Sequence, residues 1–317
     1  MEAPLQSHGA VPENGLPKVS ILIPTHNRPH YLEIALNSAL NQTYPNKEII
    51  VSDNSDDNHT QVLVAAFQEK HPDLIYLRTR NTIGIQNFFN AYKLATGEYV
   101  AYLMDDDVFH PEKLNRMVGY FMTHPTVGLV TSFRRMIDQH GNLLPQVPST
   151  ERLVETDALI NGKSLGKYML EHGNNVVGEP TTAMVRHRDI PKGLGWFHDK
   201  QYRLLTDVAT WLDILAKSDC VYISEPLSYF RLHDEQDQKS NNNVRLNASL
   251  EWFNLFLDAY QNNEFFDNKA QFQSLMTGKL DGLKYYIQTS VDPSVLTDKI
   301  KSDIDGIVAR AQQLIEA

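Results

Sequence analysis

Four short apolar segments, rich in β-branched residues and separated by helical patterns, occupy the first third of the chain. They lie at residues 18–24, 47–52, 74–77 and 99–104. Apolar residues at helical spacing occupy about 31–40, 59–70 and 85–95 between them. Strands that alternate with helices in this way predict βαβ units joined by right-handed crossovers. The sequence therefore predicts an α/β protein with a mixed, mostly parallel sheet flanked by helices, the central strands being buried on both faces.

The fourth segment ends in three consecutive carboxylates, Asp105, Asp106 and Asp107. Like charges this close repel each other, and burying them unpaired costs several kcal/mol each. A divalent cation removes that cost, and hard cations such as Mg²⁺ and Mn²⁺ prefer oxygen ligands and also bind phosphates. Asp105 and Asp107 are two residues apart, so in an extended chain they would share one face. An N-cap for the helix near residue 111 needs only one Asp, so we expect a metal–diphosphate site.

Polar loops follow the other predicted strands, and all belong to the same edge of the sheet. The first strand runs into 24–28, the second into 53–57, and the third leads to the loop 81–84. Ligands of open α/β sheets bind beyond the carboxyl ends of the strands. We therefore expect Thr25, Asp53 and Asp107 to lie together despite their separation in sequence.

The pattern changes after residue 130. A fifth strand at 127–133 precedes a hairpin signal at 138–142, and a weakly patterned region covers 146–175. The remaining expected elements are a helix at 207–215, strands at 221–223 and 227–232, and a polar segment from 233 to 243. From about residue 244 the apolar residues recur only at helical spacing, in three sets. The predicted organisation is a disordered tail (1–17), an α/β domain (18–240, in halves 18–130 and 131–240) and a helical C-terminal region (241–317).

Composition excludes several classes of protein. A formal net charge of -10 over 317 residues argues against a nucleic-acid partner. The single cysteine, Cys220, rules out an internal disulfide and fits a reducing compartment. No apolar stretch approaches the length of a membrane span, and residues 1–16 lack the features of a signal peptide. We expect a cytoplasmic protein. Two roles of the C-terminal helices stay open: peripheral contact with the inner face of the membrane, and formation of a homo-oligomer.

The motifs, in their order and spacing, resemble the family 2 glycosyltransferases of the GT-A fold. Four segments carry the resemblance: 19–28, 39–55, 81–84, and 97–99 leading into 105–107. It is strong over about residues 18–130 and looser to about residue 240, and the helical C-terminal region has no counterpart in it. The resemblance implies an inverting hexosyltransferase that uses a nucleotide sugar and Mn²⁺ or Mg²⁺.

The resemblance also implies roles for individual residues. It implies nucleotide binding by Pro24, Thr25, Asn27, Arg28, Asp53, Asn81, Gly84, Asp105, Asp106 and Arg231. Within this set, Asp53 would accept a hydrogen bond from the base, typically uracil, and Arg231 would contact the diphosphate. Asp107 would be the direct metal ligand, and His233 would complete the coordination. The metal would bridge both phosphates and neutralise charge as the nucleoside diphosphate departs.

The second half of the resemblance concerns the acceptor. Asp207 matches the Asp of the family's Glu–Asp pair, which deprotonates the acceptor hydroxyl, although Thr206 replaces the Glu. A plain helix N-cap is the alternative role for Asp207, and Asp213 is the competing base. Glu179 and Trp196 lie where the family binds its acceptor, Trp196 being a platform for a sugar ring. The polar segment 234–243 would be a lid over the donor.

The function that the sequence favours is metal-dependent transfer of a sugar, from a UDP-sugar by expectation, to a hydroxyl acceptor. That acceptor would be a carbohydrate, a lipid-linked oligosaccharide or a protein. One alternative is a sugar-1-phosphate nucleotidyltransferase. That class needs a glycine-rich phosphate loop directly after the first strand, and residues 24–28 contain no glycine, which disfavours it. The other is a non-catalytic nucleotide-sugar-binding assembly module.

Overall fold

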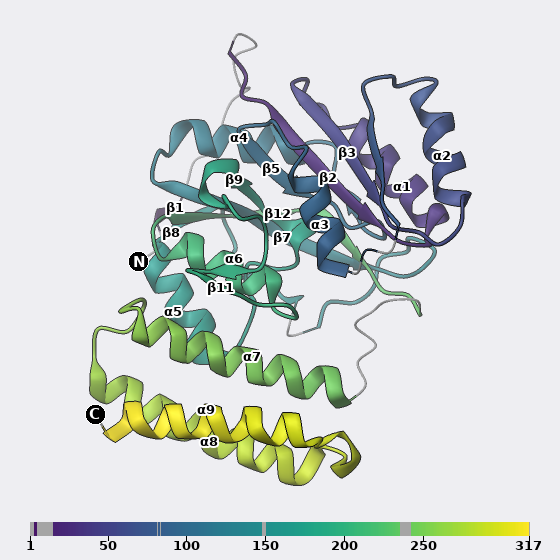
Figure 1. Cartoon of the computed structure of the whole chain (residues 1–317). Coiled ribbons are helices and arrows are strands. Elements are labelled where there is room, and N and C mark those ends of the chain that lie inside the picture. The colour runs from purple at the N-terminus through teal and green to yellow at the C-terminus, as the bar shows by residue number, and fades with distance from the viewer. Residues whose placement is uncertain are drawn as a thin grey trace.

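The computed structural model describes residues 3–4, 15–80, 82, 84–147, 150–234 and 242–316. Within these residues a ten-stranded sheet has helices on both faces, and a helical C-terminal region lies below it in the view of Figure 1.

The sheet has the order β1-β8-β12-β7-β9-β5-β2-β3-β4, with β6 paired to β12 at one side. Two groups of strands are parallel: β5 (Tyr99–Tyr102), β2 (Val19–Thr25), β3 (Lys47–Asp53) and β4 (Ile75–Arg78), and then β7 (Val127–Ile137) with β12 (Asp219–Arg231). Four short strands pair antiparallel to their neighbours: β1 (Ala3–Pro4), β6 (Val108–Phe109), β8 (Ala158–Ile160) and β9 (Met184–Arg186). β9 joins the two parallel groups because it pairs with both β5 and β7. A separate hairpin is formed by β10 (Trp196–Phe197) and β11 (Lys200–Gln201).

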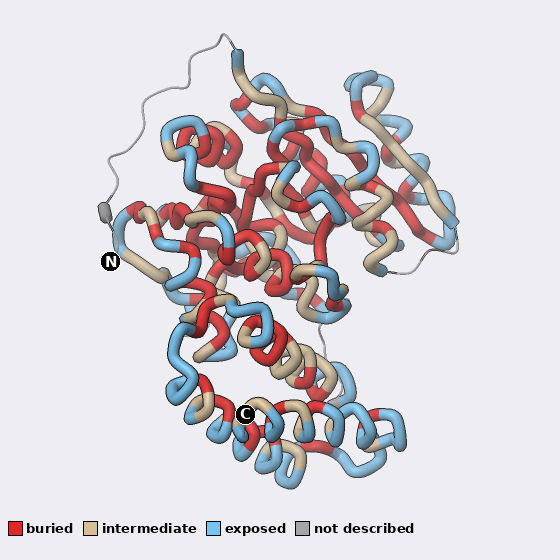
Figure 2. Tube along the Cα trace, turned by 60° about the vertical axis from the view of Figure 1, so that its left-hand side comes forward, coloured by how far each residue is buried: buried red, intermediate tan, exposed pale blue. Residues whose placement is uncertain are grey.

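Alternating side chains of the central strands enter two different cores. In β2, Ile21 and Ile23 pack in one core with helices on that face, whereas Leu22 packs in the other. The six helices of the α/β part are α1 (Pro29–Leu40), α2 (His59–Gln68), α3 (Gly84–Tyr92), α4 (Lys113–Thr123), α5 (Gly162–His172) and α6 (Thr206–Leu215). The buried residues run through the middle of the sheet in Figure 2. The prediction of central strands covered on both faces is confirmed.

The C-terminal region consists of α7 (Asn242–Gln261), α8 (Lys269–Ser290) and α9 (Asp298–Glu316). Their apolar residues belong to the same core as Trp211 of α6, with Phe256, Phe272 and Ile307 among them. Each helix turns buried residues inward and exposed residues outward in Figure 2. The predicted helical C-terminal region is confirmed, and it packs on the α/β part through a shared core.

Several elements differ from expectation. The two last predicted strands are one strand, β12, whose register shifts around Pro226, and β7 continues to Ile137. The weakly patterned region holds β8 and the eleven-residue α5. Ala3–Pro4 of the predicted tail form β1. Residues 1–2 and 5–14 of that tail, and 235–241 of the predicted lid, lie outside the described residues, so the expectations for those parts stay predictions. No helix in the described ranges is both long and apolar enough to cross a membrane.

Candidate active site

The carboxyl ends of β2, β3 and β5 meet at one edge of the sheet, as predicted. Thr25 at the end of β2 lies beside Asp53 at the end of β3 in the strand register. Its hydroxyl also donates a hydrogen bond of 2.8 Å to Asp105, which follows β5. Three segments that are far apart in the sequence therefore meet at Thr25. We call Asp105, Asp106 and Asp107 the acid cluster.

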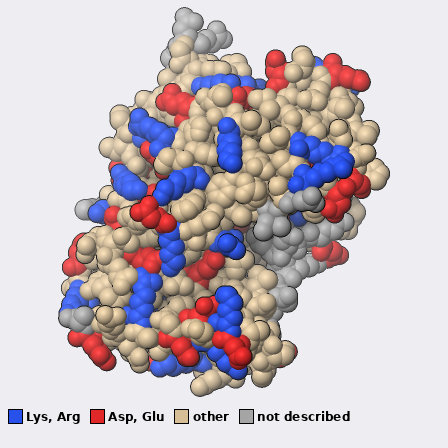
Figure 3. All heavy atoms as spheres, in the orientation of Figure 1, with Lys and Arg blue, Asp and Glu red and all other residues tan. Residues whose placement is uncertain are grey.

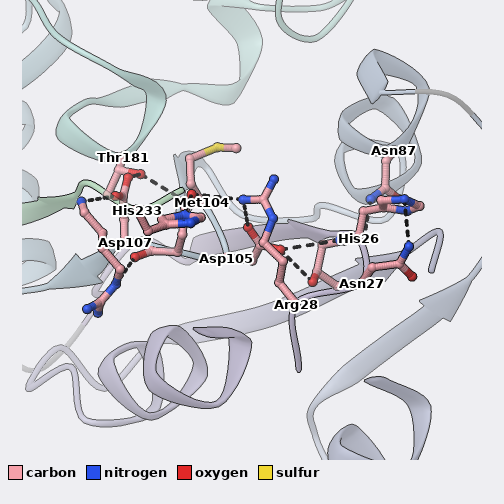
Figure 4. A network of polar contacts seen from close by, with 12 residues as sticks. His26, Asn27, Arg28, Asn87, Met104, Asp105, Asp107, Thr181 and His233 are labelled. Carbon is pink, nitrogen blue, oxygen red and sulfur yellow. Dashed lines mark hydrogen bonds and ion pairs between the residues drawn. The ribbon is translucent and has the colours of Figure 1, made fainter. Parts of the chain in front are cut away.

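The chain turns within the acid cluster, so its carboxylates point in different directions. The amide of Asp107 donates to the carbonyl of Met104 (3.1 Å), which closes the turn. Asp105 and Asp107 therefore do not share a face: Figure 4 shows Asp105 beside Arg28 and Asp107 beside Thr181. Asp107 accepts hydrogen bonds from the hydroxyl of Thr181 and from the amide of Arg231 (3.0 Å).

Asp106 lies between two basic side chains. Its Oδ2 is 2.9 Å from Nη1 of Arg28 and 2.9 Å from Nε2 of His233. Arg28 also reaches Oδ1 of Asp105 at 3.3 Å, so one guanidinium bridges two carboxylates of the cluster. The ring of His233 packs on Tyr31, with 4.4 Å between centroids. His233 thus meets the acid cluster at Asp106.

Burial changes the protonation of the cluster. Asp105 is 3% exposed and Asp107 is fully buried. Burial raises the pKa of Asp105 to about 7, although the positive charge of Arg28 opposes the shift. Burial, and then the neighbouring charge of Asp106, raises the pKa of Asp107 well above its ordinary value. Both groups therefore hold protons more tightly than exposed carboxyls do.

Arg231 is directed into the protein and is 2% exposed. Its Nε donates to the carbonyl of Asp106 (2.7 Å), and its Nη1 donates to those of Asp138 (3.1 Å) and Gln139 (3.3 Å). The guanidinium of Arg231 therefore stabilises the turn of the acid cluster through the carbonyl of Asp106. Contact of Arg231 with a diphosphate stays a prediction.

The predicted base-reading residue, Asp53, is fully buried and already has partners. Its carboxylate accepts from the hydroxyl of Tyr76 (2.6 Å) and from the amide of Ser55 (2.8 Å). Asn27 takes a left-handed conformation (φ 55°), and its side chain bonds both ways with Asp56 in the second loop. These contacts hold the first two loops together.

Three other residues of the nucleotide set occupy simpler positions. Pro24 is a buried residue inside β2, opposite Ser52 of β3, and Gly84 begins α3. Asn81 lies outside the described residues.

Asp207 lies in the first turn of α6, with a loop packed against it. Its Oδ2 accepts a hydrogen bond of 2.9 Å from Asn175, whose side-chain amide also bonds both ways with Gly178. Burial raises the pKa of Asp207 to about 6; the amide of Val208 opposes the shift and the charge of Glu179 adds to it. The pKa is thus raised toward neutrality, where a general base is most effective.

The charge of Glu179 acts on both Asp207 and the acid cluster. Glu179 forms an ion pair of 2.6 Å with Arg134 of β7, and its charge also raises the pKa of Asp107. Glu179 is therefore close enough to both groups to influence their protonation.

Trp196 lies elsewhere. It lines a cavity with Asp189 and Ser218. Asp189 follows β9, which runs antiparallel to β5 and ends opposite Tyr99, the first residue of β5, and Ser218 directly precedes β12. The cavity is therefore at the amino-terminal edge of the parallel strands, away from the acid cluster. The structure does not bring Trp196 together with Asp207 and Glu179.

The donor set fits a divalent cation that shares its coordination with a ligand. Asp106 and His233 offer a carboxylate oxygen and an imidazole nitrogen, which suit Mn²⁺. No group of three or more His, Cys, Asp or Glu side chains in the described part of the chain is arranged to hold a metal alone. Catalytic Mg²⁺ and similar ions are commonly held by one or two protein groups plus substrate phosphates and water.

Four residues of the site carried no usable signal in the sequence. Thr181 and Asn175 act through contacts with Asp107 and Asp207, and Arg134 acts through Glu179. The side-chain amide of Asn87 in α3 donates to the carbonyls of Thr25 (3.0 Å) and Ser52 (2.9 Å), which ties the ends of β2 and β3 together. Each is a single polar residue inside an ordinary helix, strand or loop pattern.

The sequence matches the profile described as "Glycosyl transferase family 2" over residues 20–189. An uncharacterized glycosyltransferase of Nostoc sp. is 28% identical over 224 residues, covering 70% of this chain and 67% of that protein. The putative teichuronic acid biosynthesis glycosyltransferase TuaG of Bacillus subtilis is 25% identical over 247 residues, which cover 76% of this chain and 88% of TuaG.

Solved structures resemble the fold. S. aureus TarS 1-349 in complex with UDP-GlcNAc superposes with a TM-score of 0.58 at 14% identity, covering 94% of this chain and 81% of that one. The mannosyltransferase PcManGT from Pyrobaculum calidifontis, in complex with GDP-Man and Mn²⁺, gives 0.54 at 14% identity, covering 95% and 88%. At this identity the likeness establishes the fold, and the predicted GT-A fold is confirmed.

Proposed function

The chain belongs to glycosyl transferase family 2, and from this premise we propose that it transfers a sugar from a nucleoside-diphosphate sugar to a hydroxyl acceptor with inversion at the anomeric carbon. The observation that carries the proposal is the meeting of Asp106 and His233, 2.9 Å apart, at the edge where the loops after β2 and β3 also end.

In this proposal Asp106 and His233 hold the divalent cation, and the role expected of Asp107 passes to Asp106. Asp107 is fully buried and bonded to Thr181 and Arg231, which favours a structural role for its carboxylate. When bound, the cation neutralises charge on the departing nucleoside diphosphate.

The donor lies over the first two loops. Arg28 presents a planar cation beside Asp105 and Asp106, and its side chain is 16% exposed, so we assign the diphosphate to Arg28 rather than to Arg231. Thr25, Asn27 and the loop after Asp53 border the nucleoside. Because Tyr76 already donates to Asp53, reading of a base by that carboxylate requires this hydrogen bond to be exchanged.

Asp207 takes the proton from the acceptor hydroxyl as the oxygen attacks the anomeric carbon. Its raised pKa, about 6, leaves it ionised at neutral pH and still basic enough to accept the proton. Asn175 orients the carboxylate through Oδ2. Glu179, held by Arg134, lies beside Asp207 and borders the acceptor.

The experiment that tests this function measures release of UDP and of GDP from a panel of nucleotide sugars, with and without Mn²⁺. We expect slow Mn²⁺-dependent hydrolysis of one donor without acceptor, abolished in Asp106→Asn. Release that is independent of the cation would contradict the proposed site, and no release from any donor would contradict the proposed transfer. TarS was solved with UDP-GlcNAc and PcManGT with GDP-Man, so both nucleotides belong in the panel.

The acceptor is a carbohydrate, a lipid-linked saccharide or a protein in this proposal, and the TuaG relative favours a polysaccharide. Positive and negative side chains are interspersed over the C-terminal helices in the face shown in Figure 3. Contact of these helices with the inner face of a membrane, or with a second copy of the chain, stays a prediction, as does a cytoplasmic location.

A further inference from the structure

The cavity that contains Trp196 has a volume of about 410 Å³. Its walls come from the 3₁₀ turn His187–Asp189, the β10–β11 hairpin and the C-terminal half of α6. It lies at the opposite edge of the sheet from the acid cluster. No residue of the proposed transfer centre lines it.

Three buried polar atoms of the lining have no hydrogen-bond partner in the described part of the chain. They are Oδ2 of Asp189, Nε1 of Trp196 and Nε2 of His198. Only ten side-chain atoms among the described residues share this condition, and three of them belong to this one lining. Native proteins pair the great majority of their buried polar atoms. The three together include a carboxylate acceptor, an N–H donor and an imidazole nitrogen that can do either.

The formal charges of the lining cancel. Each of its three basic residues forms an ion pair with an acidic residue of the same lining: Arg188 with Asp189 (3.8 Å), Lys192 with Asp199 (2.7 Å) and Lys217 with Asp213 (2.8 Å). A phosphate or nucleotide site would offer cations beyond those its own acids neutralise. The lining therefore favours an uncharged, polar ligand.

The indole of Trp196 supplies an aromatic wall. The ring is half-buried, and the exposed Lys192 places its Nζ 4.9 Å from the ring centroid. His198, two residues further on, has φ 52°, which suits the first residue of a two-residue hairpin loop, and donates its amide to Asp213 (2.8 Å), which fixes the end of the hairpin on α6.

We propose that this cavity binds a neutral saccharide unit, at a site separate from the transfer centre. Sugar hydroxyls both donate and accept, so a bound saccharide offers partners of both kinds to the polar groups of Asp189, Trp196 and His198. The C–H face of a sugar suits an indole face. The saccharide class follows from the lining alone; that the bound unit is part of an acceptor or product glycan rests on the proposed function.

Tryptophan fluorescence tests the proposal on the full chain. The protein has three tryptophans, of which Trp211 is buried in α6 and Trp252 of α7 lies outside the cavity. Titration with neutral disaccharides of glucose, galactose and N-acetylglucosamine should change the emission of the wild type for at least one sugar. Trp196→Phe should abolish the change, and Trp252→Phe, the matched control, should keep it. Ligand-observed NMR on the same samples should show Kd raised about tenfold or more in Trp196→Phe and in the nearly isosteric Asp189→Asn, a change of about 1.4 kcal/mol per tenfold.

The proposal is overturned if no sugar of the panel binds, or if Trp196→Phe and Asp189→Asn both bind as tightly as the wild type. Displacement of the saccharide by UDP or GDP with Mn²⁺ would also overturn it, because it would place the sugar in the transfer centre. Circular dichroism of each variant checks that the fold is retained. A chain that binds saccharide here yet hydrolyses no donor would contradict the proposed function and leave this site standing.

Discussion

The Nε2 atom of His233, two residues beyond the end of β12, lies 2.9 Å from Oδ2 of Asp106, which precedes it by 127 residues. The two side chains come from opposite sides of β9, the antiparallel strand that joins the two groups of parallel strands. An imidazole and a carboxylate at this distance can share a proton or a cation.

The first prediction concerns the cation. Asp106→Asn and His233→Ala should each weaken Mn²⁺ binding by at least about tenfold, since each removes one of the two proposed protein ligands. The measurement is titration of Mn²⁺ followed by electron paramagnetic resonance. His71→Ala, at an exposed position after α2, is the control. Equal Mn²⁺ affinity in all variants would refute the assignment.

The second prediction identifies the base. Asp207→Asn should lower turnover by about 10²–10⁴-fold while donor binding is unchanged, because only deprotonation of the acceptor is lost. Asp213→Asn should keep its turnover, since Asp213 accepts from the amide of His198 and pairs with Lys217 at the other end of α6. Transfer assays with calorimetric donor binding separate the two effects. The opposite pattern would make Asp213 the base.

The third prediction concerns pH. A general base must be ionised, so turnover should rise with pH through about 6, the pKa of Asp207, and level off above it. Asn175→Ala removes a hydrogen bond that favours the ionised carboxylate, so its acidic limb should move to higher pH. Asn174→Ala, at the exposed neighbouring position, should leave the limb in place. If the acidic limb of the pH–turnover profile stays in place in Asn175→Ala, the side-chain amide of Asn175 does not position the base.

The fourth prediction links the cation to stability. The pKa of Asp105 is raised from 3.8 to about 7 and that of Asp107 is raised in the same direction, so the native state binds more protons than the unfolded state over this range. The contribution of these groups to stability is therefore greatest below pH 4 and is lost as pH rises toward 7. A cation bound at Asp106 favours the ionised forms of the neighbouring Asp105 and Asp107, so Mn²⁺ should raise Tm more at pH 7.5 than at pH 5.5 relative to EDTA.

Scanning calorimetry with Mn²⁺ and with EDTA at both pH values makes this comparison. Asp106→Asn should reduce the Mn²⁺ effect at each pH. If Mn²⁺ raises the Tm of the wild type equally at the two pH values, the result would count against cation binding at the acid cluster.

The fifth prediction concerns the join between the α/β part and the C-terminal helices. A Cβ at Gly166 in α5 would overlap the ring of Phe265, which lies between α7 and α8. Gly166→Ala should therefore destabilise the protein by about 1–3 kcal/mol. Gly278 in α8 has open space around it, so Gly278→Ala should stabilise by up to about 1 kcal/mol. Urea unfolding compares them, and equal changes would show that α5 does not pack tightly here.

The sequence predicted the parts of the fold that burial dictates. Strands such as β2 are covered on both faces and so are apolar throughout, and the ends of parallel strands share an edge, which is why Thr25 and Asp53 could be placed together. β9 has only three residues, Met184–Arg186, and its antiparallel direction depends on both neighbours. No local pattern encodes such a choice.

The site was harder to predict because its side chains are directed by distant partners. Asp107 was expected to point with Asp105, but the turn and the contact with Thr181, 74 residues later, direct it elsewhere. The guanidinium of Arg231 has the chemistry of a phosphate ligand, yet it donates to the carbonyl oxygens of Asp106 and Asp138 and is buried. Trp196 was placed by analogy with an acceptor pocket, and the hairpin puts it at the other edge of the sheet.

The short strands β9 and β6 have a consequence for the enzyme as a whole. Asp106 follows β5, in the half of the sheet that would hold the nucleotide, and His233 follows β12, in the other half. Two short strands connect these halves: β9, between β5 and β7, and the two-residue β6, which pairs with β12. The bonds from Arg231 to Asp106 and Asp107 also cross this junction, so main chain and side chain together set the separation of the imidazole and the carboxylate. A cation at the proposed site would add one more link between the halves, and amide hydrogen exchange of Met184–Arg186 should slow when Mn²⁺ is added.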